Sequence, residues 1–481
     1  TQVAGARLAD GRVPDGIYAV RGYRFAWGDR RRVETLARLA ELSRGDGLDP
    51  KDFHDKALRE LLAGPGLDRL SGRAREDADV LLSEILLRLI HHYRYGKVDP
   101  QALDSTWNHA EGPYSGDLVR DLARVVEADD LEFELRSLTP RPVFYLRLKA
   151  GLARYREIAA AGGWQPVPPG RTLSPRMRDG RVPAVRARLR LSGDFLGPDP
   201  GDARLYDAPL KEAVTRFQQR HNLGIDGVIG PATLAAMNVP AEARVDQIRV
   251  NLERMRWVYD ELPEDYLLVD VAGQRVVLFR NSEAVWQSRV IVGRPDRPTP
   301  VFRDQVEYLE LNPSWTVPPT ILKEDILPNA RKNPGYVSKK GLEVVTRDGR
   351  KVSLGAVNWH VSAGSFPYML RQPPGEKNAL GLVKFMFPNR FSVYLHDTPG
   401  RDLFDKPQRL YSSGCVRVEN PMELAELVLN DPGRWNQEKF QAVVASGRTR
   451  WVHLKEPLPI ILAYWTAEAG EDGQVRFRED V

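Results

Sequence analysis

The chain has 481 residues, of which 42% are hydrophobic and 28% are charged, and its formal net charge is +5. This length suffices for two to four globular domains with buried cores. The mild positive charge would suit a polyanionic surface such as a cell wall or an anionic membrane, but an ordinary mixed-charge surface explains it better. No nucleic-acid partner is expected.

No uninterrupted apolar run reaches the 18 or so residues that a membrane-spanning helix needs, so none is expected. The chain begins at Thr1 with no initiator Met and no signal-peptide core, which indicates a mature or trimmed protein. An export signal or membrane anchor removed ahead of Thr1 is compatible with this start. A single cysteine suits an exported protein that avoids mispaired disulfides, although a cytosolic protein can have the same count.

The first 160 residues or so carry apolar residues at three-and-four spacing, which predicts helices. His91 and His92 are adjacent inside one of them and point about 100° apart, so a metal pair is not expected there. The predicted helices are Val33–Leu42, Ala57–Leu62, Ala78–Tyr93, Leu118–Val126 and Phe144–Ala161.

A stretch rich in Pro, Gly and Arg, from Gly162 to Pro183, predicts a linker or an extended connector. The compact block that follows, residues 184–239, centres on a helix over 210–221. A turn over 226–233 and a short helix from Leu234 complete it.

From about residue 262 the pattern changes to short β-branched or aromatic runs that end at turn residues, which predicts a mostly β domain. Asn420 and Pro421 have the residue types of an N-cap and a first helical position, and predict a helix over Met422–Leu429. The predicted strands are Tyr266–Val271, Arg275–Arg280, Val285–Val292, Val306–Leu311, Val383–Phe387, Phe391–His396, Cys415–Val418, Arg450–Leu454 and Ile460–Trp465.

Residues 318–374 interrupt this strand spacing and are rich in Pro, Gly, Lys and aromatic residues. An irregular surface excursion is one interpretation. We favour an insertion that covers a site, because so many aromatic side chains would be costly to leave exposed.

The only cysteine, Cys415, cannot form an internal disulfide, and His396 precedes it by 19 positions. Acyl transfer by a thiol needs a base and oxyanion donors. His396 ends one predicted strand and Cys415 begins the next, so the imidazole can reach the thiol. Gly414 before the cysteine leaves the backbone unobstructed, and the N–H groups of Gly414 and Cys415 are the expected oxyanion donors.

Two further side chains share faces with this pair, because residues two apart in a strand point the same way. Tyr394 precedes His396 by two positions and offers a hydroxyl donor, although tyrosine in a strand is more often packing. Arg417 follows Cys415 by two positions and would hold a substrate carboxylate or favour the thiolate. From spacing alone, a surface salt bridge explains Arg417 nearly as well.

The segment from Ser412 to Arg417, with His396 upstream, resembles the signature of the L,D-transpeptidases of the YkuD fold. The wider match is to their large periplasmic branch, typified by YcbB, and it covers roughly residues 160–480. Most YkuD members carry His where this chain has Ser413, a serine that the YcbB-like branch shares, so His396 alone can serve as the base. The branch is further matched by the segments 312–318, 371–381, 384–389 and 394–399, by Leu403-Phe404 and by Arg409.

The resemblance implies a multidomain α+β protein. A helical scaffold-like domain would span 1–165, a three-helix peptidoglycan-binding domain 184–239, and a mostly β catalytic domain 250–481, with 318–374 as its lid. Besides Tyr394 and Arg417, the side chains of Ser413, Trp315 and Asn378 are expected to bind substrate.

By the same resemblance, Cys415 would attack a donor stem peptide of peptidoglycan at its third residue and form a thioester. The side-chain amine of a neighbouring stem would then resolve it to a 3→3 cross-link. The protein would be periplasmic, would need no cofactor or metal, and would be acylated by carbapenems. Other cell-wall synthesis proteins are conceivable partners.

Four alternatives stay open. Water in place of the amine would give an L,D-carboxypeptidase, and a protein amine would give lipoprotein attachment to the wall. A non-catalytic wall-binding scaffold belongs to another class, and the intact His396 and Cys415 pair argues against it. A zinc peptidase using His360, His396 and His453 lacks any metal-binding spacing.

Overall fold

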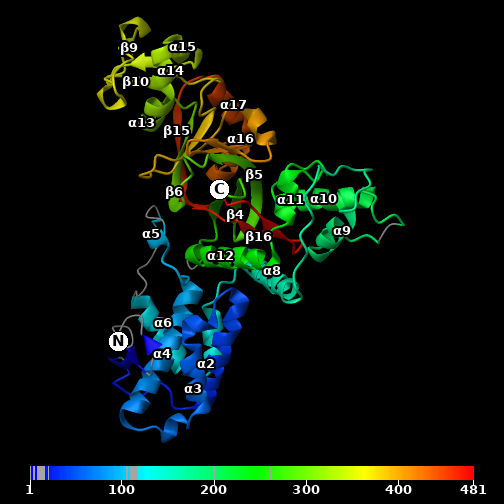
Figure 1. Cartoon of the computed structure of the whole chain (residues 1–481). Coiled ribbons are helices and arrows are strands. Elements are labelled where there is room, and N and C mark those ends of the chain that lie inside the picture. The colour runs from blue at the N-terminus through cyan, green and yellow to red at the C-terminus, as the bar shows by residue number, and fades with distance from the viewer. Residues whose placement is uncertain are drawn as a thin grey trace. The chain divides into compact units, whose positions relative to one another are not determined.

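The computed structural model describes residues 2–3, 6–7, 17–19, 21–103, 107–108, 116–198, 201–259 and 262–480. They form two compact units that divide after Leu262, and the segment Trp465–Asp480 returns to the first unit. Helices dominate the first unit and strands the second, so the expected multidomain α+β class is confirmed (Figure 1).

The N-terminal part of the first unit is helical wherever its apolar periodicity predicts a helix. Carboxylates cap several of these helices: the side chain of Asp29 accepts the Arg31 N–H at the start of α2, and that of Asp130 accepts the Phe133 N–H at the start of α7. The apolar faces build one core around α4. The elements are α2 (Arg30–Leu42), α3 (Asp55–Ala63), α4 (Gly72–Arg94), α5 (Pro100–Leu103), α6 (Gly116–Glu127), α7 (Leu131–Ser137), α8 (Val143–Ala160), three 3-10 turns (Ser43–Asp46, Pro50–Phe53, Leu67–Arg69) and the strands β1 (Gln2–Val3) and β2 (Ala6–Arg7).

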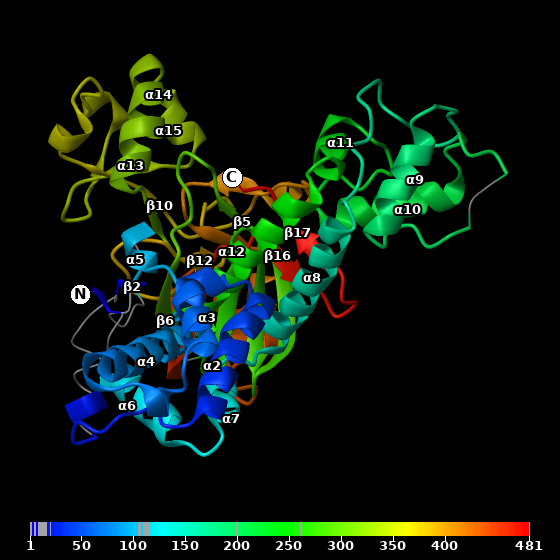
Figure 2. The same cartoon turned by 60° about the horizontal axis from the view of Figure 1, so that its bottom comes forward.

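The helices α9 (Val182–Leu191), α10 (Ala208–Arg220) and α11 (Pro231–Met237) lie together in both views (Figures 1 and 2). The buried Gln218 amide fixes the turn between the last two, because its Nε2 donates to the Val228 carbonyl and its Oε1 accepts the Gly227 N–H. The block begins slightly before residue 184, since α9 starts at Val182.

The first unit is completed by α12 (Ala241–Tyr259) and by the end of the chain, which forms β16 (Ala467–Ala469) and β17 (Val475–Phe477). Asn251 of α12 and Thr466 exchange two hydrogen bonds of 2.8 and 2.9 Å. The strand-rich unit is therefore shorter at both ends than the 250–481 expected, because 250–259 continue a helix and 465–480 bury their apolar residues in the first unit.

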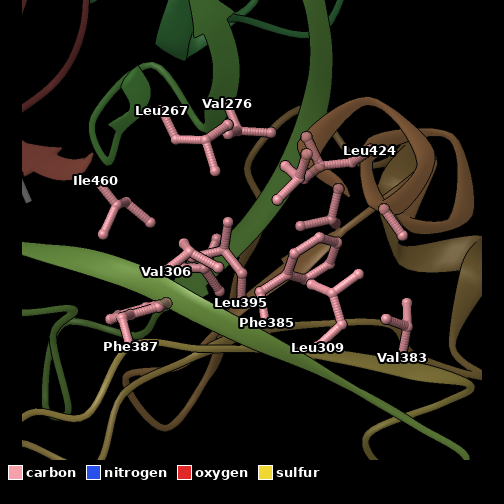
Figure 3. Close-up of a cluster of buried hydrophobic side chains, with 14 of the residues drawn as sticks. Leu267, Val276, Val306, Leu309, Val383, Phe385, Phe387, Leu395, Leu424 and Ile460 are labelled. Carbon is pink, nitrogen blue, oxygen red and sulfur yellow. The ribbon is translucent and has the colours of Figure 1, made fainter. Parts of the chain in front are cut away.

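The second unit is built on a nine-stranded sheet with the order β13-β5-β14-β12-β11-β6-β15-β3-β4, and β4 also pairs with β5, so the sheet closes on itself. Apolar residues alternate along the strands and converge on one core with Leu424 of α16 (Figure 3). The strands are β3 (Tyr266–Asp270), β4 (Arg275–Arg280), β5 (Glu283–Gly293), β6 (Phe302–Leu311), β11 (Val383–Met386), β12 (Leu395–His396), β13 (Leu410–Ser412), β14 (Val416–Val418) and β15 (Arg450–Ala463); the helices are α16 (Pro421–Leu429) and α17 (Gln437–Ala445), and a 3-10 turn spans Arg401–Asp405.

Two local expectations for this unit are wrong. The strand expected over 391–396 is only Leu395–His396, because Ser392 takes a left-handed φ of 54° and breaks the extended backbone. The two strands expected from 450 to 465 are one strand with a register shift between His453 and Leu458. Helix α16 begins at Pro421 with Asn420 at its N-cap, as expected, although the Asn420 side chain makes no capping hydrogen bond.

The insertion between β6 and β11 is a folded piece with its own core rather than an irregular excursion. The rings of Trp359 and Phe366 lie 5.8 Å apart within that core, beside Leu327, Val337 and Leu370. It comprises β7 (Trp315–Thr316), α13 (Pro319–Ile321), a π-helical turn (Leu322–Ile326), α14 (Leu327–Lys332), α15 (Gly335–Lys339), β8 (Glu343–Val345), β9 (Lys351–Val352), 3-10 turns (Leu354–Ala356, Ala363–Ser365) and β10 (Met369–Gln372).

Candidate active site

The site lies on the face of the sheet opposite the apolar core, where β12 and β14 run parallel. Leu395 is in register with Val416, and His396 with Arg417. Leu395 and Val416 are fully buried on the core side. Since neighbours in a strand alternate between faces, Cys415 and Arg417 share the opposite face with His396.

Cys415 enters β14 directly beside Tyr394, whose carbonyl accepts the Val416 N–H at 3.0 Å. The thiol is half-buried and donates to the Ser392 carbonyl at 3.8 Å. Burial raises the pKa of the thiol, while the Tyr394 backbone N–H and the cations of Lys384 and Arg417 act to lower it. The thiol therefore rests protonated and needs a base.

The loop before the cysteine is held by hydroxyl groups. Thr299 Oγ1 donates to the Gly414 carbonyl at 2.8 Å, and Ser412 Oγ accepts the Gly414 N–H at 3.1 Å and donates to the Cys415 carbonyl. The Gly414 N–H is thus hydrogen-bonded within the loop, and its service as an oxyanion donor stays a prediction. What requires glycine is its φ of +112°. Ser413 is exposed and accepts from Arg297 at 3.1 Å.

His396 is 4% exposed, and its Nδ1 is hydrogen-bonded to the carbonyl of Asp397. A carbonyl can only accept, so Nδ1 carries the proton and Nε2 is the basic nitrogen. Burial, assisted by the Arg417 and Lys384 cations, lowers the pKa of His396 to about 3. The imidazole is therefore neutral at physiological pH.

Asp397 was not singled out from the sequence, although it holds the base in place. Its buried carboxylate accepts the N–H groups of Leu382 and Thr398 and pairs with Arg401. The sequence could have pointed to Asp397 only through its position directly after His396, the candidate base.

Two cations flank the base across the sheet. Arg417 is half-buried, and its Nε has no hydrogen-bond partner among the described residues. Lys384 of β11 is the register partner of His396 on the other side. Sequence reasoning gave Lys384 no role, because only the strand pairing brings it to the base.

The other two expected substrate-binding residues lie in and beside the insertion, and their contacts with substrate stay a prediction. Trp315 lies in β7 and packs on the core of the insertion. Asn378 is 2% exposed, and its Nδ2 donates to the carbonyls of Pro313 and Pro373 at 3.0 and 2.9 Å. Its amide is consumed in holding a loop, so a structural role fits it better.

Nothing in the described part of the chain forms the cluster of three or more His, Cys, Asp or Glu side chains that a metal ion needs. Of the histidines in the zinc hypothesis, His360 lies in the insertion, and the His453 ring packs 5.0 Å from that of Tyr308. Helices long and apolar enough to cross a membrane are likewise missing from the described residues.

Comparison with known families matches three segments of the chain. Residues 264–448 match an L,D-transpeptidase catalytic domain, residues 15–152 a scaffold domain, and residues 178–237 a putative peptidoglycan-binding domain. The first match contains His396 and Cys415.

A putative L,D-transpeptidase of Haemophilus influenzae is 33% identical over 227 residues, which is 47% of this chain and 46% of the relative. The match thus spans about half the length of that relative. Among solved structures, an L,D-transpeptidase of Xylanimonas cellulosilytica is 16% identical with a TM-score of 0.19, covering 61% of this chain and 99% of that one. One of Mycobacterium smegmatis is 12% identical with a TM-score of 0.20, covering 41% and 58%. With TM-scores this low, no structural conclusion is drawn from either similarity.

Proposed function

We propose that the chain, which matches an L,D-transpeptidase catalytic domain of the YkuD fold, a scaffold domain and a putative peptidoglycan-binding domain, forms 3→3 cross-links between peptidoglycan stem peptides through a thioester on Cys415. One observation carries the proposal: a thiol and a neutral imidazole with a fixed tautomer share one face of two paired strands, opposite the apolar core.

In the first half-reaction, Nε2 of His396 takes the Cys415 proton, and the thiolate attacks the carbonyl of the third, L-centred residue of a donor tetrapeptide. The Cys415 N–H makes no hydrogen bond to another described residue and is our candidate donor to the oxyanion. The peptide bond then breaks, His396 returns the proton to the departing D-Ala amine, and the thioester is left.

In the second half-reaction, the side-chain amine of a neighbouring stem's diaminopimelate attacks the thioester carbonyl. His396 accepts the amine proton, the new amide forms, and the thiolate leaves and recovers that proton. Arg417 is placed to bind a substrate carboxylate, because its guanidinium is half-buried beside the thiol with a free Nε. No redox or nucleotide cofactor is required, since the donor's peptide bond supplies the energy.

The remaining parts are assigned roles around this reaction. We infer that the block at 178–237 holds the wall, that residues 318–374 act as a lid, and that the protein works in the periplasm, where other wall-synthesis proteins are candidate partners. Carbapenems are expected to acylate Cys415.

Mass spectrometry of purified disaccharide-tetrapeptides incubated with the protein tests the proposal. A 3→3 dimer is expected. Tripeptide as the sole product would instead indicate an L,D-carboxypeptidase, and transfer only to a protein amine would indicate lipoprotein attachment.

The Cys415→Ala variant is the matched control: it should form no dimer yet still bind sacculi. Iodoacetamide should abolish activity and EDTA should not. Full activity of Cys415→Ala would overturn the mechanism, and chelator-sensitive activity would favour the zinc alternative.

A further inference from the structure

On the face of the sheet opposite the apolar core, His396 has a charged neighbour on each side: Arg417 on β14 and Lys384 on β11. β11 lies between β6 and β12, and its Lys384 is in register with His396 on one side and with Glu310 on the other. Val383 and Phe385 are fully buried on the core face, so the Lys384 side chain stands on the face that carries Cys415. Adjacent strands are about 4.8 Å apart, which places the lysine two strands from the nucleophile.

The Lys384 ammonium is held by an aromatic ring rather than by an ion pair. Its Nζ lies 3.8 Å from the centre of the Tyr394 ring, and Tyr394 is the neighbour of Cys415 on the adjacent strand. No carboxylate stands within ion-pair distance of Lys384 among the described residues. Glu310, its register partner on β6, acts on the ammonium electrostatically without forming an ion pair with it.

A half-buried ammonium without a paired carboxylate is costly unless its charge is used. Burial lowers the pKa of Lys384, whereas Glu310 and a thiolate at Cys415 raise it. Lys384 and the thiolate therefore stabilise one another. The same cation disfavours a proton on His396, and Arg417 acts on both groups from the other side.

We propose that Lys384 is a positioning residue of the active site, whose ammonium, seated on the Tyr394 ring, stabilises the thiolate of Cys415 and keeps His396 in its neutral form. Glu310 keeps that ammonium charged. The titratable and charged groups that face Lys384 are Tyr308 and Glu310 of β6, Tyr394 and His396 at β12, and Cys415 and Arg417 at β14.

The test is the rate of Cys415 alkylation by iodoacetamide as a function of pH, in the whole protein. Only the thiolate reacts, so the midpoint of the profile reports the pKa of the thiol. In Lys384→Met we expect the midpoint to rise by about one pH unit, which is about tenfold slower alkylation on the acid limb. Lys384→Arg, which keeps a charge, should restore most of the rate.

The Glu310→Gln variant tests the same electrostatic effect on the thiol by removing the carboxylate that raises the pKa of Lys384. Without that carboxylate the pKa of Lys384 falls further, so the ammonium is lost at lower pH and the alkylation midpoint should again rise, by less. This variant keeps the proposal falsifiable if Lys384→Met folds poorly. Lys439→Met is the matched control, because Lys439 is an exposed residue of α17 on the core side of the sheet, and its midpoint should equal that of the parent protein.

A midpoint in Lys384→Met or Glu310→Gln that equals the control would overturn the inference, even if the melting temperature falls, because a purely structural lysine would change stability alone. Alkylation needs no peptidoglycan. An absence of cross-linking in the parent protein would therefore count against the proposed function without altering this result.

Discussion

At Gly414 a single backbone angle decides where the thiol lies. An added Cβ there would meet the Pro298 carbonyl and Val393 at 3.6 Å, which is ordinary contact, so glycine is required by its φ of +112° and not by space. Because the Cys415 N–H and Sγ follow this residue directly, a change of the angle would turn both away from His396.

We predict that Gly414→Ala slows the alkylation of Cys415 at least tenfold and destabilises the second unit by about 1–3 kcal/mol, the range for a residue held in a disfavoured backbone conformation. Calorimetry and iodoacetamide kinetics measure the two effects. Gly447→Ala is the control: Gly447 also has a positive φ, +61°, with no atom within 4 Å of the added Cβ. It should cost stability but leave alkylation unchanged, and equal slowing in both variants would refute the argument.

The buried His396 makes stability depend on pH. Its pKa is about 3 in the folded protein, against about 6.5 when unfolded, so between these values the unfolded chain binds one more proton. The free energy of unfolding must therefore fall as the pH drops below about 6.5.

We predict that, on going from pH 8 to pH 5, the parent protein loses about 2 kcal/mol more stability than His396→Gln, which has no titrating imidazole. Calorimetric scans of both proteins at the two pH values provide the comparison. The many carboxylates titrate equally in both. Parallel losses would show that His396 is not held neutral by its surroundings.

At the scale of elements, the insertion is tied to the catalytic loop by one side chain. Arg297, in the loop between β5 and β6, is 11% exposed and pairs with Glu324 at 2.5 Å and Asp325 at 2.7 Å in the π-helical turn of the insertion. Its Nη1 also donates to Ser413, two residues before Cys415. If the insertion closes over the site as a lid, the contacts of Arg297 would fix its position relative to the loop before Cys415.

We predict that Arg297→Gln loosens this contact by about 1 kcal/mol, a discounted value since both carboxylates are partly exposed. Amide exchange over 319–332 should accelerate about fivefold. Arg350→Gln, which breaks the exposed pair with Asp348 elsewhere in the insertion, is the control and should leave that segment unchanged. Exchange as slow in Arg297→Gln as in the control would contradict the assignment.

The elements that the sequence predicts best are those with a clear period. The five N-terminal helices and the strands β3 to β6 occur where predicted, because burial of one face imposes the spacing. The length of the strand that ends at His396 was overestimated, because the apolar pattern does not reveal the left-handed backbone of Ser392. Lys384 was missed, and the hydrogen bonds of Gly414 and Asn378 within their loops were not foreseen, because cross-strand register and hydrogen-bond partners are properties of the fold.

At the scale of the whole molecule, the chain ends in the unit where it began. The strand β15 closes the catalytic sheet up to Ala463, and the next residues leave for the first unit. There Arg220 Nη1 donates to the Val475 carbonyl at 2.7 Å, and Val475 and Phe477 are almost fully buried. The stability of the helical first unit thus depends on the last residues of the sequence.

We predict that a chain ending at Tyr464 has a destabilised first unit and an intact catalytic sheet. Full burial of Val475 and Phe477 contributes about 1.5–3 kcal/mol each, so the calorimetric transition of the first unit should fall by several degrees or disappear. The alkylation profile of Cys415 should not change, because β15 keeps its pairing with β3 and β6. Glu471→Ala, at an exposed turn position, is the control for changes in this segment. If truncation instead altered thiol reactivity and left the first transition in place, the C-terminal strands would belong energetically to the catalytic unit.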